Sequence, residues 1–300
     1  MINQWIEAAR PKTLPAAAMP VLVGSALAYN DATFYWVPAL ICLGFALLMQ
    51  VGTNFANDYL DFERGSDTAE RIGPPRAVAS GWITPGTMRR AAIGVLAGGF
   101  ALGCLLIAYG GWMLLGIGLA SVLCAWIYTG GPKPLAYIGL GDLFVVLFFG
   151  LIAVGFTYYV QAGSFSNLSW VLGLGIGLLV NNILVINNYR DAEQDRAGGK
   201  RTLTVRFGRS FAILQYQLSI TVASLVPLVF LMNEYSTWIL GAVLIYPAGR
   251  WLTLKISRLP IDRSFNRALG WTSGLLIAYG LLISAGLVLD RIFAANLELK

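Results

Sequence analysis

The chain has 300 residues, of which 57% are hydrophobic and only 12% are charged, and its mean hydropathy is +0.68. Soluble domains carry about 25% charged residues. This composition therefore predicts a polytopic membrane protein and excludes a disordered chain, a disulfide-stapled secreted module and a nucleic-acid-binding domain. The net charge of +6 is explained by the excess of Lys and Arg that cytoplasmic loops of membrane proteins carry.

Seven apolar segments, two of them of double length, predict nine transmembrane helices, since a span needs about 20 apolar residues. The segments are 13–30, 34–56, 91–131 (two spans divided at 109–112), 143–189 (two spans divided at 161–169), 211–233, 235–254 and 268–289. The first contains two prolines and lacks a cleavage site, so we interpret it as a span rather than a signal peptide. No loop is long enough for a soluble domain, so we expect an all-α bundle forming a single transmembrane domain over residues 1–300.

Basic residues divide unevenly between the two sides of this arrangement. Of the 21 Lys and Arg residues, 19 lie in the N-terminal segment and in the loops on the same side, and the other two lie in the C-terminal tail. The positive-inside rule then predicts a bacterial-type inner membrane protein with a cytoplasmic N-terminus and an outer C-terminus.

The residue types that are missing limit the possible chemistry. The chain has no histidine, which excludes His-ligated metals and Ser-His-Asp or Cys-His catalytic groups. Cys42, Cys104 and Cys124 lie in apolar runs without CxxC spacing, so we interpret them as small buried hydrophobic side chains. A metal in this chain would have oxygen ligands, which favours a hard cation such as Mg²⁺.

Two groups of Asn and Asp residues lie where the second and sixth predicted spans end. The first group is Asn54, Asn57, Asp58 and Asp61, and the second is Asn187, Asp191 and Asp195. Offsets of three and four residues place Asn54, Asp58 and Asp61 along one helical face, with Asn57 one turn before Asp61, and they place the whole second group along one face. Carboxylates at this depth are costly and tend to be functional, and oxygen donors suit Mg²⁺ bridging to a substrate phosphate. The alternative is that both groups are only acidic caps on solvated helix ends. The match of the two groups in side, spacing and residue type favours a functional site over this alternative.

Basic, acidic and aromatic residues near these groups are further candidates for the site. The basic ones could clamp a diphosphate or serve topology alone, and they are Arg71, Arg76, Lys133, Lys200 and Arg201. Asp142, at the start of the fifth span, could orient a substrate hydroxyl, pair with a cation or complement a helix dipole. Tyr128 and Tyr189 could stabilise an allylic cation or lie at the membrane interface.

In combination, these motifs resemble the UbiA superfamily of intramembrane aromatic prenyltransferases, over essentially the whole chain. The matching stretches are residues 10–15, 57–61 with 65–67, 71–74, 137–142 and 200–206, together with Asp191 and Asp195. They look most like the branch that uses 1,4-dihydroxy-2-naphthoate. The sequence departs from the broad pattern at Gly65, where a third Asp is common and the next acid is Asp67. It also departs in the five-residue spacing between Tyr128 and Lys133.

The resemblance implies a reaction between a polyprenyl diphosphate and 1,4-dihydroxy-2-naphthoate that releases diphosphate and CO₂ and yields a demethylmenaquinol. It implies Mg²⁺, with Mn²⁺ as a possible substitute, and a membrane-lipid environment without nucleic acid. The implied metal ligands are Asn57, Asp58, Asp61, Asp191 and Asp195. The implied catalytic residues are the four Asp of this set with Lys133 and Asp142. The implied substrate-binding residues are Asn54, Asn57, Asp67, Arg71, Arg76, Tyr128, Asn187, Tyr189, Lys200 and Arg201.

Two alternatives remain at this point. An enzyme of the same fold could use another acceptor, such as 4-hydroxybenzoate or haem. A transporter for Mg²⁺ or a phosphorylated solute would also place acids in a membrane, but a permeation path is expected to have polar sites through the bilayer. Here both acid groups lie on one predicted side.

Overall fold

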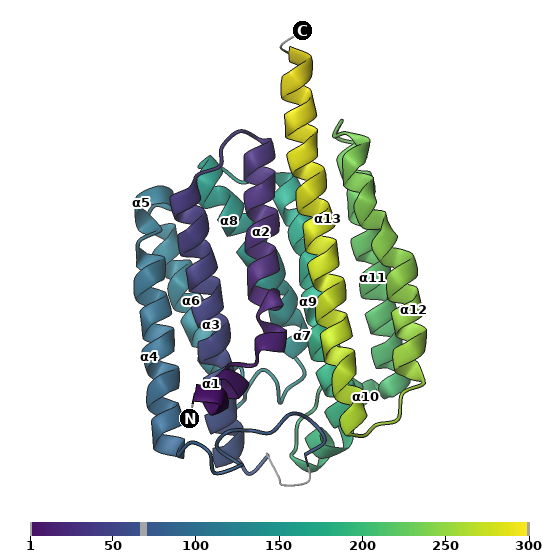
Figure 1. Cartoon of the computed structure of the whole chain (residues 1–300). Helices are drawn as coiled ribbons and strands as arrows, with labels where there is room; N and C mark the ends of the chain where they lie inside the picture. The colour runs from purple at the N-terminus through teal and green to yellow at the C-terminus, as the bar shows by residue number, and fades with distance from the viewer. Residues whose placement is uncertain (1, 67–70, 299–300) are drawn as a thin grey trace.

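A computed structural model describes residues 2–66 and 71–298, and in these residues it contains helices and no β-strand (Figure 1). The longer helices are α1 (Ile2–Ala9), α2 (Pro15–Asn30), α3 (Trp36–Glu63), α4 (Pro85–Cys104), α6 (Met113–Ile127), α8 (Ala153–Ala162), α9 (Asn167–Ala197), α11 (Arg209–Leu231), α12 (Ile245–Ser257) and α13 (Asn266–Glu298). Shorter segments connect or extend them, and these are η1 (Pro11–Thr13), α5 (Ile107–Gly110), α7 (Gly141–Val145), η2 (Val146–Ile152), α10 (Leu203–Phe207), η3 (Thr237–Leu244) and η4 (Arg263–Phe265).

The all-helical membrane fold is confirmed, but the count of nine spans is not. In the described part of the chain, seven helical segments are long and apolar enough to cross a membrane. The first and fourth predicted spans form α2 with 16 residues and α6 with 15 residues. Both are shorter than the roughly 20 residues that a bilayer core requires. The second and sixth predicted spans continue further than expected, to Glu63 in α3 and Ala197 in α9.

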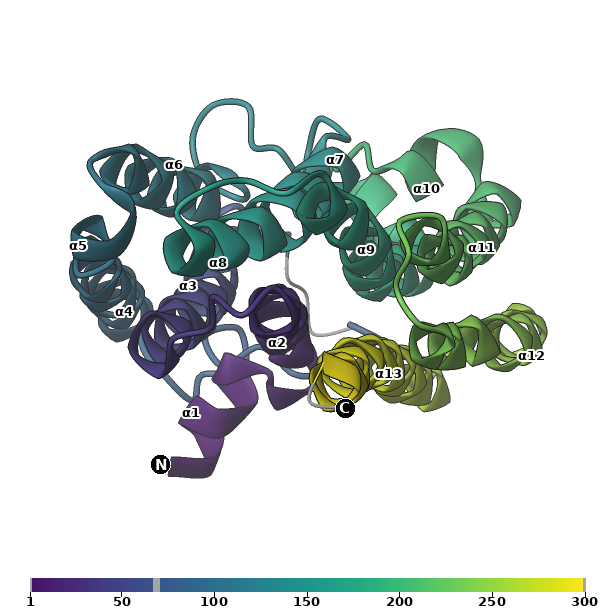
Figure 2. The same ribbon diagram turned by 90° about the horizontal axis from the view of Figure 1, so that it is seen from above.

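Helix α2 lies inside the bundle, where it packs against α3, α8, α9 and α13 (Figure 2). Its small side chains are almost all buried, and together with buried residues of α9, α11 and α13 they form the main apolar core. Helix α9 is the most buried of the seven candidate spans. The two helices at the centre of the bundle are thus α2 and α9. The central position of α9 places its polar C-terminal turns at one end of the bundle, among the surrounding helices.

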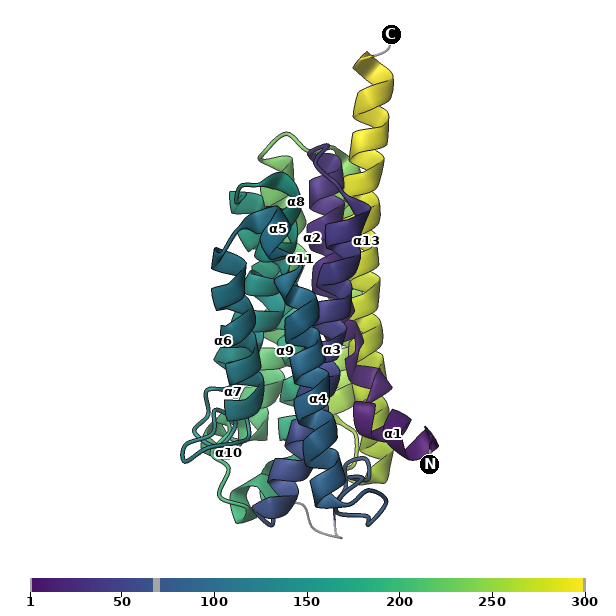
Figure 3. The ribbon, with the colours of Figure 1, turned by 90° about the vertical axis from the view of Figure 1, so that its left-hand side faces the viewer.

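The two ends of the bundle differ. Helices α1 and α10 and the C-terminal turns of α3 lie at one end, and α13 projects beyond the other helices at the opposite end (Figures 1 and 3). We call the first of these the motif end, because both Asn/Asp groups lie there.

A π-helical segment, η2, packs very closely on α9. The backbone of Gly150 in η2 approaches Gly173 and Gly177 of α9, and a Cβ atom on Gly150 would lie 2.6 Å from the Cα of Gly177. Backbone atoms cannot rotate away as a side chain can. The approach therefore requires glycine, and it holds the cavity-lining residues of η2 in position against the core.

We expect Gly150→Ala to lower the free energy of unfolding by about 1–3 kcal/mol, because overpacking forces two backbones apart. Thermal unfolding of the purified protein in detergent measures this effect. The matched control is Gly94→Ala in α4, where an added Cβ meets nothing within 4 Å and gains helix propensity over glycine. Equal melting of the two variants would contradict the close packing of η2 on α9.

Candidate active site

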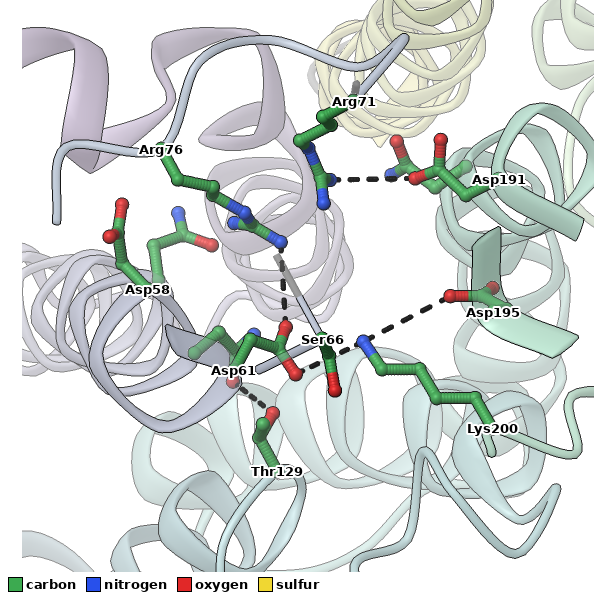
Figure 4. A network of polar contacts seen from close by, with 12 residues as sticks. Asp58, Asp61, Ser66, Arg71, Arg76, Thr129, Asp191, Asp195 and Lys200 are labelled. Atoms are coloured by element: carbon green, nitrogen blue, oxygen red, sulfur yellow. Dashed lines mark hydrogen bonds and ion pairs between the residues drawn. The ribbon is translucent and has the colours of Figure 1, made fainter. Parts of the chain in front are cut away.

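Carboxylates from both predicted motifs meet at the motif end. Helix α3 presents Asp61, and the last turns of α9 present Asp191 and Asp195 from the facing side (Figure 4). The Lys200 ammonium lies between them, 3.0 Å from Asp61 Oδ1 and 4.0 Å from Asp195 Oδ1. The backbone N–H of Lys200 donates to the Asp195 carbonyl over 2.8 Å. The turn that closes α9 therefore aims this lysine at both motifs.

Two arginines of the segment after α3 complete this charge cluster. Arg76 lies 3.6 Å from Asp61 Oδ2, and Arg71 lies 3.4 Å from Asp191 Oδ2. Their side chains are only 10% and 14% exposed. The planar fork of N–H donors in a guanidinium group fits the oxygens of a phosphate as well as those of a carboxylate. Arginines held in this position could therefore bind a phosphate. The structure thus brings together six of the charged residues that the sequence singled out.

Arg190 is a residue of this site whose place the sequence analysis missed. Its guanidinium donates two hydrogen bonds of 2.7 Å to Asp191, from Nε to Oδ1 and from NH2 to Oδ2. It also donates to Asn187 Oδ1 over 3.0 Å and to Asn266 Oδ1 of α13 over 2.9 Å. Its side chain is only 1% exposed. Arg190 therefore fixes the rotamer of Asp191 and ties α9 to α13.

Tyr137 supports Asp61 from the segment between α6 and α7. Its hydroxyl donates to Asp61 Oδ1 over 3.1 Å and lies 2.6 Å from Ser66 Oγ. Burial raises the pKa of the Tyr137 hydroxyl, and the Asp61 carboxylate raises it further. The hydroxyl consequently keeps its proton and remains a donor to Asp61 across the neutral range. The Lys200 ammonium also lies over the Tyr137 ring, 5.1 Å from its centroid.

Asp58 turns away from the other carboxylates (Figure 4). Its two oxygens accept the backbone N–H groups of Ala77 and Val78, both over 3.0 Å, and the residue is fully buried. This carboxylate anchors the segment that carries Arg71 and Arg76. Asp58 therefore positions this segment and its two arginines.

The two Asn side chains of the first motif group also have local partners. Asn54 donates to the Ala9 carbonyl over 2.9 Å and to Thr13 Oγ1 over 3.2 Å, joining α3 to the N-terminal segment. Asn57 accepts a hydrogen bond of 2.6 Å from Thr129 Oγ1. Both residues line the cavity that opens beside the charge cluster.

This apolar cavity, of about 260 Å³, runs from the motif end into the bundle. Its polar lining at the motif end includes Arg10, Asn54, Asn57, Tyr128 and Asn187. The remainder is largely aliphatic and aromatic, and it includes Val21, Leu106, Leu114 and Val160 and the π-helix residues Phe148 and Phe149. The space therefore has a polar end and an apolar body.

Three predicted site residues lie apart from the charge cluster or outside the described residues. Lys133 and Arg201 are exposed, and among the described residues neither side chain has an ion pair with a motif carboxylate. Asp67 lies outside the described residues. Among the described residues, the lysine that lies between the two motifs is thus Lys200, which follows α9, and not Lys133 of the segment between α6 and α7.

Two further predicted residues are buried but turned toward other partners. Tyr189 stacks on Phe265 with ring centroids 5.4 Å apart, and it is not part of the cavity wall. Asp142 accepts hydrogen bonds from Asn181 over 3.1 Å and from Gln215 over 2.7 Å, which places it between α9 and α11. Its contact with an acceptor stays a prediction.

The charge cluster is suited to a divalent metal only together with a ligand. Among the described residues, no three acidic side chains lie close enough to hold an ion by themselves. Mg²⁺ usually keeps several waters and binds one or two carboxylates plus substrate phosphates. Asp61 and Asp195 already share one positive charge, the Lys200 ammonium, which shows that the space between the motifs accommodates a cation. The oxygen donors therefore fit Mg²⁺ bound with a diphosphate.

Comparison with known proteins places this geometry in a family. The profile of the UbiA prenyltransferase family matches residues 17–273. The chain belongs to this family. UbiA relatives named 1,4-dihydroxy-2-naphthoate octaprenyltransferase include one from Haemophilus influenzae, 41% identical over 79% of this chain and 81% of the relative. Another, from Escherichia coli, is 37% identical over 93% of this chain and 95% of the relative.

The fold of the family is also recognisable among solved structures. A UbiA homologue from Archaeoglobus fulgidus, solved bound to DMAPP and Mg²⁺, superposes with a TM-score of 0.63 at 17% identity. The match covers 94% of this chain and 99% of the homologue. The likeness at this identity confirms the UbiA fold.

Proposed function

We propose that this protein transfers a polyprenyl group from a polyprenyl diphosphate to 1,4-dihydroxy-2-naphthoate, giving a demethylmenaquinol of menaquinone biosynthesis. The observation that carries the proposal is the charge cluster beside an apolar cavity with one polar end. A charged head and a long apolar tail are what a polyprenyl diphosphate presents. The names of the relatives at 37–41% identity support the acceptor.

The residues of the charge cluster divide between the diphosphate of the donor substrate and the metal ion that would bind with it. Arg71, Arg76 and Lys200 would bind the diphosphate oxygens. Asp61, Asp191 and Asp195, with Asn57 beside them, would hold Mg²⁺, as the Mg²⁺ in the solved homologue suggests. The ion would supply positive charge where the leaving group becomes more negative. Asp58 is left out of this metal set because its carboxylate points away from the other three (Figure 4), toward the backbone N–H groups of Ala77 and Val78.

The reaction breaks the allylic C–O bond, and the bonding electron pair leaves with the diphosphate. Arg71, Arg76 and Lys200 stabilise that charge, because they are fixed in place before the bond breaks. The ring carbon that carries the acceptor's carboxylate then forms the new C–C bond to the allylic cation. Loss of CO₂ returns its electron pair to the ring and restores aromaticity. Tyr128 lies at the polar end of the cavity, where its ring could face the allylic cation.

We also propose the finer topology, in which α2 and α6 complete nine spans with local thinning of the bilayer. The motif end would then be cytoplasmic, as would the N-terminus, and the C-terminus would lie outside. The basic residues of the charge cluster and of segment 255–267 support this orientation through the positive-inside rule.

The test is the product formed by purified protein from a radiolabelled polyprenyl diphosphate and each of three acceptors. We expect 1,4-dihydroxy-2-naphthoate to give a product whose mass equals that of the acceptor's carboxylate form plus the prenyl group minus CO₂. The competing acceptors, 4-hydroxybenzoate and haem, should react at no more than about 1% of that rate. The loss of a single polar contact between an enzyme and its substrate can lower kcat/KM by orders of magnitude. Preferred prenylation of either of them would contradict the naphthoate assignment.

A further inference from the structure

A second cavity, of about 330 Å³, lies at the motif end between segment 71–80 and the start of α13. It shares no lining residue with the apolar cavity. Asn266 of α13 donates to the Ile72 carbonyl over 3.0 Å, which fixes one wall against the other. Gly73 packs directly on the Arg190 guanidinium, since a Cβ atom there would lie 2.8 Å from its NH2. The cavity is therefore a fixed space adjoining the charge cluster.

The described lining of this second cavity is rich in arginine. Three arginines line it, namely Arg71, Arg76 and Arg263, and among the described residues no acid does. Asn266 begins α13, so the positive end of that helix's dipole lies at the same wall. A concave surface of one charge attracts an oppositely charged ligand, and guanidinium groups favour phosphate oxygens. The chemistry of the wall matches a phosphate-bearing anion.

Two of these arginines contribute both to the second cavity and to the charge cluster. Arg71 and Arg76 line the second cavity, and they also contact Asp191 and Asp61 in the charge cluster over 3.4 and 3.6 Å. Arg263 is different, because it lines the second cavity and has no ion pair with the described motif carboxylates. An anion moving from the cluster to the cavity would keep Arg71 and Arg76 as partners and gain Arg263.

We propose that the second cavity binds the inorganic diphosphate released by prenyl transfer, at a site separate from the one where the prenyl diphosphate reacts. The proposal rests on the proposed function, which supplies the diphosphate. A lipid headgroup carries the same phosphate chemistry. The experiment therefore has one arm that separates the free anion from the lipid.

The test is calorimetric binding of inorganic diphosphate to the purified full-length protein in neutral detergent with excess EDTA. Chelation removes the contribution of a divalent metal, so that the measured affinity comes from the basic side chains, and Arg263 separates the second cavity from the charge cluster. We expect Arg263→Gln to weaken this binding about ten- to a hundredfold, the loss typical of one charge-assisted hydrogen bond. The matched control is Arg267→Gln, an exposed arginine of α13 outside the cavity wall, which should bind like the wild type.

Turnover supplies the second readout. In Arg263→Gln we expect the inhibition constant of added diphosphate to rise by the same factor, while the KM for the prenyl diphosphate stays within about twofold. A parallel rise in that KM would make the cavity part of the substrate site and overturn the proposal. Undetectable binding in EDTA, or equal affinity in the Arg263 variant, would overturn it as well.

Micelles containing phosphatidylglycerol provide the lipid arm. Unchanged diphosphate affinity in them supports the proposal, and displacement of diphosphate by the lipid assigns the cavity to a headgroup and overturns it. The proposed function fails separately. If no acceptor is prenylated but diphosphate binding still depends on Arg263, the anion site stands and the prenyl-transfer assignment is wrong.

Discussion

Asp61→Asn is expected to lower kcat/KM by about a hundredfold or more and to raise the Mg²⁺ concentration that gives half-maximal turnover. Asp61 is the carboxylate of α3 that faces α9, and it contacts Lys200 and Arg76. Asparagine keeps the size of the side chain and can still accept from Tyr137, so the substitution removes mainly the charge. Steady-state rates over a Mg²⁺ titration measure both effects.

Asp58→Asn, from the same motif, is the matched control for Asp61→Asn. The buried N–H groups of Ala77 and Val78 would lose part of their acceptor, so we expect a loss of about 1–3 kcal/mol in the free energy of unfolding. The Mg²⁺ dependence should stay near that of the wild type. Full turnover by metal-stripped protein in excess EDTA would instead contradict the metal assignment for the whole cluster.

The meeting of the two motifs could be predicted because it depends on quantities that a sequence contains. Spacing of three and four residues determines which side chains share a helical face, and charge asymmetry assigns both helix ends to one side. These two arguments bring Asp61, Asp191 and Asp195 together without any knowledge of distances. They also explain why the longer extent of α3 and α9 did not disturb the prediction, since a continued helix keeps the same face.

Which cation reaches the carboxylates could not be predicted in the same way. Lys133 and Lys200 both follow glycine-containing segments on the same predicted side. The choice depends on how α9 ends, since the Lys200 N–H caps the Asp195 carbonyl and directs its side chain inward. Lys133 lies in a segment that leaves it exposed. Backbone geometry of this kind has no signature in residue spacing.

Arg190 was missed for a related reason. In the sequence it is one of several cations after the sixth span, and the expected end of that span at residue 189 leaves it in a loop. Helix α9 instead continues to Ala197, which buries Arg190 beside Asp191. The usable signal was its place at i+3 from Asn187, on the same face as the motif. The length of α2 and α6 and the π-helix η2 likewise depend on packing between helices.

Arg190→Met is expected to lower the free energy of unfolding by about 3–5 kcal/mol, because it leaves the Asp191 charge buried without its main partner. Arg71, at 3.4 Å from Asp191, compensates only in part, since it lacks the two 2.7 Å bonds that Arg190 makes. Chemical denaturation in mixed micelles measures the loss. Turnover should fall as well, because Asp191 is no longer held toward the cluster.

The double variant Arg190→Met, Asp191→Leu separates the two consequences. Replacing a whole buried ion pair by apolar side chains is often neutral or stabilising, so we expect the double variant to recover most of the stability lost in Arg190→Met. It should remain inactive, because the carboxylate proposed to hold the metal is gone. Recovery of stability without activity would show that the pair is kept for its chemistry. A double variant as unstable as the single one would show that Arg190 acts mainly through its bond to Asn187 within α9 and its bond to Asn266, which joins α9 to α13.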